Sequence, residues 1–318
     1  MSAGIYELDK GYVHGTTWHG LEQYKQLNSA VSEQQAAEVF DYPLIKCQLF
    51  DEDMAPVNGA YCIKRSDTNT VLVPTVGERF EVLSNLHLLN YISENFLAKF
   101  SDLEIESVGT LFNGKIAFLN LKIGELQIKG DESPQLNRLM YYNPLGAGGY
   151  GVLSHSVRVV CNNTLKASVA QGAANQTIKR ISHTRTAAER INNHMEEIAE
   201  VKMGLKKFEE QLNHLTTLDV DSKFVEAFSE FVFPSEKDSG RGYTMAATNR
   251  NTFMNSFETL EFMNNATRWT RYGVLQAFTY TLDNGKVRKN DAQKRAWDGL
   301  TGYRSDRKAK AFDYLLTV

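Results

Sequence analysis

Residues Leu103 to Ile123 read LEIESVGTLFNGKIAFLNLKI, and two apolar-rich runs in this stretch flank Asn113-Gly114. Both central positions of a type I′ turn need a positive φ, and Asn-Gly is the pair that adopts this turn most readily. We therefore predict an antiparallel hairpin with Leu103–Phe112 and Lys115–Ile123 as its strands.

The chain before this hairpin continues the strand-like pattern. Short apolar runs between Asp, Asn, Gly and Ser clusters predict strands at Leu44–Phe50, Ala60–Lys64 and Val71–Pro74. A short helix is predicted before these strands, over 32–41, and a second helix, over 85–100, separates them from the hairpin. The first has Ser32 as its cap and Gln35 at the capping-box position. The first 30 residues show no clear period, and we interpret them as an arm.

The chain after residue 185 has a helical pattern. Two seams recur every seven positions, and they consist of Ile191, Ile198, Leu205 and Leu212, and of His194, Val201, Phe208 and Leu215. Such heptads are typical of a long helix that packs on another helix, from the same or a neighbouring chain. Further helices are predicted over 220–232, 246–265, 268–282 and 287–316. The order predicts an α+β fold, with a β-rich core over 1–184 and a helical region over 185–318.

The composition bounds the class of protein. The chain has 318 residues, of which 42% are hydrophobic, so it is long enough to bury a core. It has no apolar run long enough to cross a bilayer and no secretory pattern at its start. We therefore expect a cytoplasmic protein without a membrane partner. Three cysteines without a C-x-x-C spacing argue against a disulfide framework or a zinc ribbon.

The net charge of −3 conceals two basic segments. Residues 155–190 hold six basic residues against one acid, and residues 284–310 hold nine against three. The other positions hold 20 basic and 34 acidic residues. Attraction to a polyanion depends on such local charge rather than on the total.

The first basic segment predicts a nucleic-acid site. Its basic and titratable side chains suit a phosphate track, and they are Arg158, Lys166, Lys179, Arg180, His183 and Arg185. Three tyrosines just upstream are candidates for stacking on bases, and they are Tyr141, Tyr142 and Tyr150. The alternative is that these tyrosines pack in strands and that the basic side chains form an ordinary solvated face.

The lack of recognisable catalytic motifs favours a protein that is not an enzyme. The sequence has no H-E-x-x-H, no phosphate-binding G-x-x-x-x-G-K-[ST] and no G-x-S-x-G. Residues 146–151 match G-x-G-x-x-G, but a strand-like run follows them where a dinucleotide fold needs a helix. The acidic cluster Asp51, Glu52 and Asp53 leaves a Mg²⁺-dependent nuclease open as an alternative, since hard cations take carboxylates. No other cofactor is expected.

Several segments resemble a phage/plasmid-like protein family, a domain-of-unknown-function family of phages, plasmids and bacterial genomes. The most specific match is Arg158-Val159-Val160-Cys161-Asn162-Asn163-Thr164-Leu165, which is similar to the R-V-V-C-x-N-T-L core of that family. Four more segments match in order, and they are Trp18–Leu21, Val76–Val82, His183-Thr184 and Thr270–Thr279. Ser182 stands where the family has an arginine before its His-Thr pair.

The resemblance implies a mobile-element protein rather than a defined activity. The order of a β-rich front, a basic middle and a helical back is similar in outline to phage single-strand annealing proteins. That similarity implies binding and annealing of single-stranded DNA without ATP, by a homo-oligomer that forms a ring or a filament. A second alternative, besides the nuclease, is a non-enzymatic factor that binds a host protein.

Overall fold

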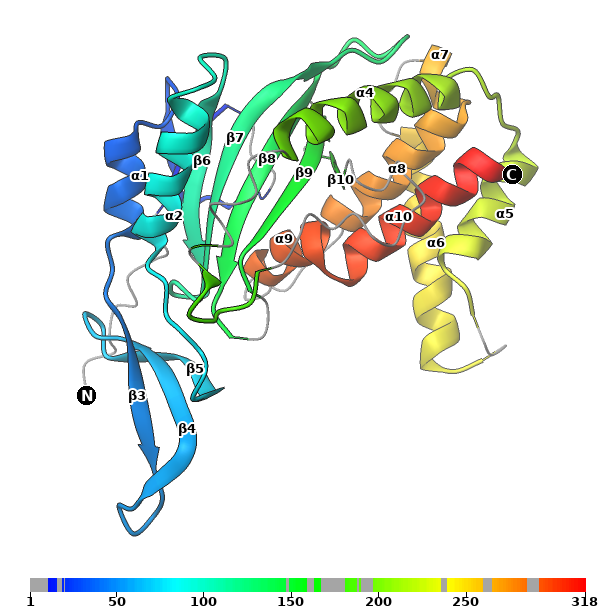
Figure 1. Cartoon of the computed structure of the whole chain (residues 1–318). Coiled ribbons are helices and arrows are strands. Elements are labelled where there is room, and N and C mark those ends of the chain that lie inside the picture. The colour runs from blue at the N-terminus through cyan, green and yellow to red at the C-terminus, as the bar shows by residue number, and fades with distance from the viewer. Residues whose placement is uncertain are drawn as a thin grey trace.

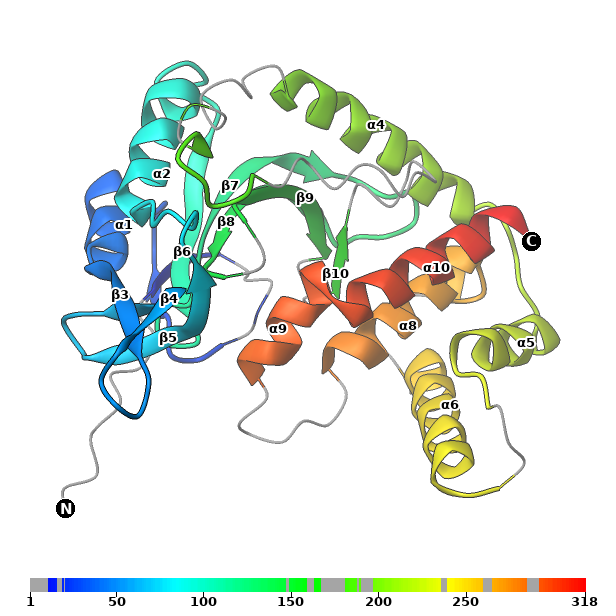
Figure 2. The same cartoon turned by 60° about the horizontal axis from the view of Figure 1, so that its bottom comes forward.

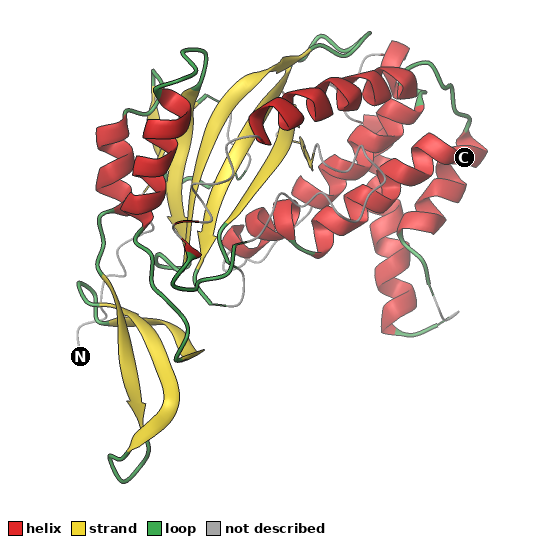
Figure 3. Cartoon of the chain, in the orientation of Figure 1, coloured by secondary structure: helices red, strands yellow, loops and turns green. Residues whose placement is uncertain are grey.

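The computed structural model describes residues 11–15, 19, 21–146, 149–158, 163–166, 181–187, 189, 197–235, 239–259, 265–284 and 292–318. In this part of the chain a seven-stranded sheet lies between two groups of helices, and a three-stranded sheet projects from the body as an arm (Figures 1 and 3). The β-rich half precedes the helical half, so the predicted α+β class is confirmed.

The large sheet has the strand order β10-β9-β8-β7-β6-β1-β2. Its strands are β1 (Gly11–His14), β2 (Lys25–Leu27), β6 (Glu104–Leu111), β7 (Ile116–Leu126), β8 (Gln135–Pro144), β9 (Gly151–Arg158) and β10 (Asn163–Lys166). Neighbours run antiparallel except β1 and β2, which are parallel. The first two strands lie in the region that the sequence predicts to be an arm, because they are too short to show a period.

The helices fall into two groups along the chain. The first contains α1 (Glu33–Phe40) and α2 (Asn85–Ile92), which a π-helical turn at Ser93–Leu97 extends. The second contains α4 (Glu197–Leu215), α5 (Ser222–Val232), α6 (Arg241–Thr259), α7 (Asn265–Arg268), α8 (Arg271–Asn284), α9 (Ala292–Thr301) and α10 (Tyr303–Thr317). The predicted capping box of α1 is confirmed, since Ser32 and Gln35 cap each other's backbone N–H groups.

The predicted hairpin forms the centre of the large sheet. Asn113 and Gly114 have φ values of 60° and 95°, and the N–H of Lys115 donates to the carbonyl of Phe112 at 3.2 Å. This is the backbone geometry that Asn-Gly predicts. Strand β7 then pairs with β6 on one side and β8 on the other.

Both faces of the large sheet are covered. Ala117, Leu119 and Leu121 of β7 belong to a core cluster with residues of α1 and α2. Ile116 and Phe118, which alternate with them, belong to a cluster with Ala296 and Leu300 of α9. Figure 2 shows the sheet curving from β6 to β10, with α8, α9 and α10 beside its β10 edge. Polar side chains on the strands are therefore buried too.

The heptad pattern corresponds to intramolecular packing over the described part of α4. Leu205, Phe208, Leu212 and Leu215 are buried in a cluster with α5, α6, α8 and α10. The rings of Phe208 and Phe312 of α10 lie 5.7 Å apart. Residues 188 and 190–196 lie outside the described part, so the first heptad stays a prediction.

One predicted helix is corrected. The continuous helix expected over 287–316 is two helices within the described residues, because the chain turns at Gly302 between α9 and α10. A Cβ at Gly302 would lie 2.7 Å from Oδ1 of Asp298. A side chain at this turn would clash, so glycine suits a sharp corner.

The projecting arm contains β3 (Leu44–Phe50), β4 (Pro56–Arg65) and β5 (Thr70–Gly77) in that order (Figure 1). Its own small core consists of Ile63, Leu72, Val73 and Val76, with Leu145 from the body. Cys47 and Cys62 face each other across β3 and β4 as free thiols. The arm is thus a separate small layer that packs on the body near its base.

Helix length and hydropathy give a further finding. Within the described ranges, none of the helices combines the length and the apolar character that crossing a membrane would require.

Candidate nucleic-acid interface

Arg158, at the end of β9, is buried in an ion pair and does not face solvent. Its Nε and Nη2 donate to the two carboxylate oxygens of Asp131, each at 2.6 Å. The two residues are 3% and 5% exposed. The hypothesis that Arg158 lines a phosphate track is therefore corrected, because the buried guanidinium already has a carboxylate partner.

The same ion pair joins the sheet to the helical half. The hydroxyl of Tyr272, on α8, donates to Oδ2 of Asp131 at 2.5 Å. It also accepts from Nε2 of Gln135 at 2.8 Å. Burial, and then the nearby carboxylate of Asp131, raise the pKa of Tyr272 well above its usual value. Arg158 thus belongs to a structural network that crosses the predicted boundary at 184/185.

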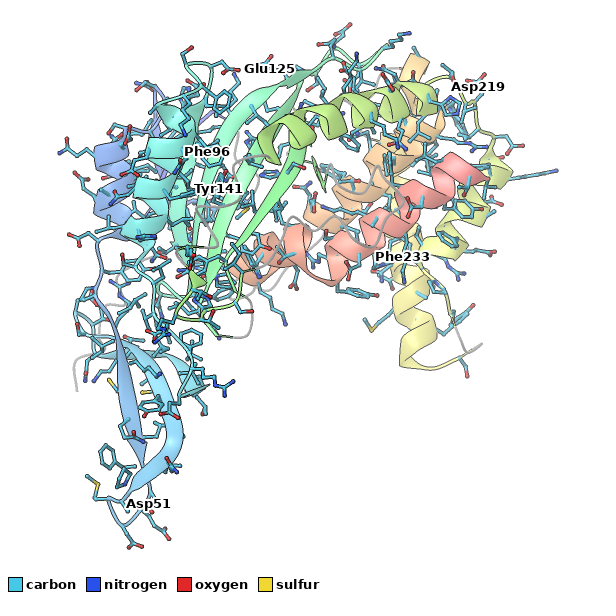
Figure 4. The ribbon with its side chains drawn as sticks, in the orientation of Figure 1. Asp51, Phe96, Glu125, Tyr141, Asp219 and Phe233 are labelled. Atoms are coloured by element: carbon cyan, nitrogen blue, oxygen red, sulfur yellow. The ribbon has the colours of Figure 1, made fainter. Side chains whose placement is uncertain are left out.

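The three tyrosines proposed for base stacking are core residues. Tyr141 packs on Phe96 with their rings 5.5 Å apart, and both residues are labelled in Figure 4. The ring of Tyr142 meets Trp297 of α9 at 5.3 Å. Tyr150 is buried, and its hydroxyl donates to the carbonyl of Leu83. The stacking hypothesis is corrected for all three rings, because neighbouring side chains already cover them.

His183 lies beside Tyr150, with the two rings 4.5 Å apart. It also stacks on Phe80, and its Nε2 lies 3.1 Å from the carbonyl oxygen of Pro144. Burial lowers the pKa of His183, so this side chain is a neutral packing residue. Of the predicted track, only Arg185 is an exposed, described side chain. Lys166 lies on β10, but its side chain is outside the described part of the structure. Lys179 and Arg180 are themselves outside the described residues.

The alternative metal residues Asp51, Glu52 and Asp53 are exposed at the far end of the arm, where Figure 4 labels Asp51. Oδ1 of Asp51 accepts the backbone N–H groups of Asp53 and Ala55, at 3.0 and 2.8 Å. Within the described ranges, no group of three or more His, Cys, Asp or Glu side chains could hold a metal ion. At Asp51, Glu52 and Asp53, which the Mg²⁺ hypothesis needs, the structure shows an exposed turn and no metal-binding cavity.

The second basic segment forms a cluster of cations where α9 and α10 meet. We define the α9–α10 cluster as Arg295, Arg304, Arg307 and Lys308. Residues 304, 307 and 308 lie on one helical turn of α10, and the corner at Gly302 folds α9 against that turn. The cluster therefore depends on the chain reversal between the two helices.

The charge of Arg304 acts on the other cations of the cluster. Burial lowers the pKa of Arg295, and the charge of Arg304 lowers it further. Burial also lowers the pKa of Lys308, where Asp283 acts in the opposite direction and Arg304 in the same direction. Nζ of Lys308 donates to Oδ1 of Asp283 at 2.5 Å. The charge of Arg304 thus lowers the pKa of both Arg295 and Lys308, and the carboxylate of Asp283 acts in the opposite direction on both.

Arg304 and Arg307 differ from the buried arginines of the sheet. Both are half-buried, and neither has a carboxylate within ion-pair distance among the described residues. By contrast, Arg138 and Arg158 are paired with Glu106 and Asp131. Half-buried like charges without carboxylates attract an anion, because they raise the local positive potential.

The two basic segments meet at this edge of the sheet. Strand β10, which carries Lys166, packs against α8, α9 and α10. Lys308 of α10 also helps to lower the pKa of His155 on β9, after burial and Arg138. The sequence left their relative position open, and the structure places their described parts side by side.

Among the comparisons with known proteins, the match comes from a family model. No curated protein and no solved structure matches this chain. The family model described as Domain of unknown function (DUF932) matches residues 73–301, which is more than half of the chain. The matched region contains the central hairpin, the Arg158–Asp131 pair and α9. The chain therefore belongs to the DUF932 family of domains of unknown function.

Proposed function

We propose that this protein binds single-stranded DNA through its phosphates at the α9–α10 cluster and anneals complementary strands without nucleotide hydrolysis. The observation that carries the proposal is the crowding of Arg304 and Arg307 without a described carboxylate partner. Phosphate oxygens supply the negative charge that such a cluster lacks, and arginine is well suited to bind them.

Phosphate binding suits annealing for a geometric reason. A strand that is held by its backbone keeps its base edges free to pair with a second strand. The burial of Tyr141, Tyr142 and Tyr150 supports this mode, because it removes the rings that would hold bases. The resemblance to a family of phages and plasmids, in which recombination proteins are common, supports the same proposal.

Binding is tested with a fluorescein-labelled oligo(dT), measured by fluorescence anisotropy between about 50 and 200 mM salt. Loss of one phosphate contact at Arg304→Gln is expected to weaken binding about tenfold and to reduce the salt slope by about one. The matched control is Lys25→Gln, an exposed cation on β2 at the opposite edge of the sheet, which is expected to leave both values unchanged. Equal losses for both variants would refute a localised site.

Annealing is tested with two complementary labelled oligonucleotides and energy transfer between their dyes, without ATP. We expect faster pairing with the wild-type protein and a slower rate with Arg304→Gln. Gel analysis of the same strands after incubation with Mg²⁺ separates the alternatives. Intact strands are expected here, whereas cleavage that Asp53→Asn abolishes would support the nuclease hypothesis instead.

A further inference from the structure

The tip of the projecting arm exposes apolar side chains to solvent. Phe50, at the end of β3, is 53% exposed, and Met54 is 76% exposed. Val57, at the start of β4, is 40% exposed. Large apolar side chains gathered at a protruding end are typical of an interaction surface. We call residues 50–57 the arm tip.

The backbone of the arm tip is held by its own hydrogen bonds. The N–H of Asp51 donates to the carbonyl of Ala55 at 2.9 Å, and the N–H of Met54 donates to the carbonyl of Asp51 at 3.1 Å. The carboxylate of Asp51 accepts two further backbone N–H groups. These bonds hold Met54 at a φ of 62°, which is unusual for a side chain of this size. The backbone of the turn is therefore ordered before binding, and Met54 is presented on it, exposed to solvent.

A groove of about 500 Å³ lies at the opposite end of the molecule, between α5, α6 and α10. Apolar side chains line most of it, and they are Phe231, Val232, Phe233, Pro234, Met245 and Ala246. Tyr303 stands at its edge and is 70% exposed. Arg307 and Lys310 of α10 supply its positive charge. We call this site the α5–α6–α10 groove.

Arg307 is held in place at the groove. Its guanidinium lies over the ring of Phe233, at 4.6 Å from the ring centre, and donates to the carbonyl of Val232. Lys310 is exposed and forms no ion pair with the described residues. The groove thus combines an apolar floor with a cationic rim.

The arm tip complements this groove in both respects. Its apolar side chains, Phe50 and Met54, match the aromatic floor. Its exposed acids, Glu52 and Asp53, match the cations of the rim. Figure 4 labels Asp51 at the tip and Phe233 beside the groove, and Figures 1 and 2 place the two regions at opposite ends of the molecule. The tip of one copy therefore cannot fill its own groove.

We propose that the arm tip of one copy seats Phe50 and Met54 in the α5–α6–α10 groove of a second copy. Because the two surfaces differ, each copy keeps one free tip or one free groove after the first contact. Such a heterologous contact repeats from copy to copy and closes into a ring or grows into a filament. The groove shares Arg307 with the α9–α10 cluster, but its apolar floor and Lys310 lie outside that cluster. Assembly can therefore be measured without DNA, through variants that leave Arg304 and Arg307 in place.

The decisive experiment mixes two variants, each defective at one surface. The tip variant carries Phe50→Ser and Met54→Ser, and the groove variant carries Met245→Glu and Lys310→Glu. Light scattering after size exclusion measures the mass of each protein without DNA. We expect assemblies for the wild type and the 35.9 kDa monomer for each variant alone. The mixture is expected to form a dimer of twice that mass, because one intact tip meets one intact groove.

A charge swap tests the polar part of the same contact. Asp53→Lys and Lys310→Glu are each expected to weaken assembly, and the chain that carries both is expected to recover it. Val71→Ser is the matched control, because Val71 is also an exposed apolar residue of the arm but lies on β5, outside the tip. It is expected to retain the assembly of the wild type.

Three outcomes would overturn the proposal. A wild-type protein that stays monomeric at the highest soluble concentration would exclude assembly through this contact. A groove variant that keeps the mass of the wild-type assembly would show that assembly does not use the groove and that the arm tips contact each other instead. A mixture that stays monomeric, although the wild type assembles, would show that the tip and the groove do not bind each other. Loss of DNA binding with assembly retained would affect only the proposed function.

Discussion

Arg158 and Asp131 form a bidentate ion pair inside the protein, with both hydrogen bonds at 2.6 Å. Tyr272 donates to the same carboxylate from α8, so a strand, a loop and a distant helix meet at one acid. Removing one partner of a buried pair leaves an uncompensated charge in a medium that solvates it poorly.

Arg158→Met is therefore expected to destabilise the protein by about 3–5 kcal/mol, measured by urea unfolding at neutral pH. The matched control is Arg185→Met, an exposed arginine of the same basic segment, with an expected change within about 0.5 kcal/mol. The double variant Arg158→Met with Asp131→Leu is expected to be less unstable than Arg158→Met alone. Equal stability of the wild type and Arg158→Met would contradict the role assigned to this pair.

Buried His155 makes stability depend on pH. Burial, and then the charges of Arg138 and Lys308, hold the pKa of His155 well below its usual value. In the unfolded chain the side chain binds a proton near about pH 6.5, whereas in the folded protein it stays neutral. The unfolded state thus binds more protons below that pH, so the free energy of unfolding falls as the pH decreases from about 6.5.

Urea unfolding about one pH unit above and one below the ordinary histidine pKa measures this loss. In His155→Gln, this decrease in the free energy of unfolding between the two pH values is expected to be smaller by up to about 1.4 kcal/mol per pH unit. The comparison uses the change with pH, so it does not depend on how stable the variant is at the higher pH. The exposed His214→Gln serves as the control and is expected to leave the loss unchanged. A steeper loss in His155→Gln than in the wild type would be inconsistent with a neutral buried imidazole.

Repulsion between Arg304 and its neighbouring cations is expected to lower the stability of the folded protein. Its charge lies among Arg295, Arg307 and Lys308 and lowers the pKa of each of them, after burial. Arg304→Gln should therefore raise the melting temperature at low salt, by a difference that shrinks as salt screens the repulsion. Thermal unfolding at about 0.01 M and about 1 M NaCl measures it. A lower melting temperature at the low salt concentration would show that Arg304 stabilises the corner.

The turn of the central hairpin gives a test of the fold itself. Gly114 has a φ of 95°, and a Cβ there would lie 3.1 Å from the ring of Tyr42. Gly114→Ala is expected to destabilise the protein by about 1–2 kcal/mol, through backbone strain and this close contact. Gly77→Ala is the control, because Gly77 has no positive φ and a Cβ added there would meet nothing within 4 Å. Urea unfolding measures the change in the free energy of unfolding for each variant. Equal changes for Gly114→Ala and Gly77→Ala would contradict the special role of Gly114.

Local chemistry explains which elements could be predicted from the sequence. The Asn113-Gly114 turn, the Ser32 capping box and strand β3 each depend on residues a few positions apart. These elements can therefore be predicted from the order of residues along the chain. The strand after residues 146–151 was predictable in the same way, and β9 follows them.

Long-range packing explains the errors. Alternation along β9 places Ser156 and Arg158 on one polar face, and a polar face is normally solvated. Here that face is covered, and the partners of Arg158 lie 27 residues away at Asp131 and, through it, on α8 at Tyr272. No local pattern in the sequence predicts that Asp131 and Tyr272 are those partners.

The sequence by itself determined the α+β class, the central hairpin and the two basic segments. Only the tertiary structure decided which basic side chains are paired in the interior and which crowd together at α9 and α10. The physical reason is that periodicity and turn propensity act between neighbours in the chain, whereas burial and charge pairing act between neighbours in space. The fold therefore moves the candidate site from Arg158 to Arg304.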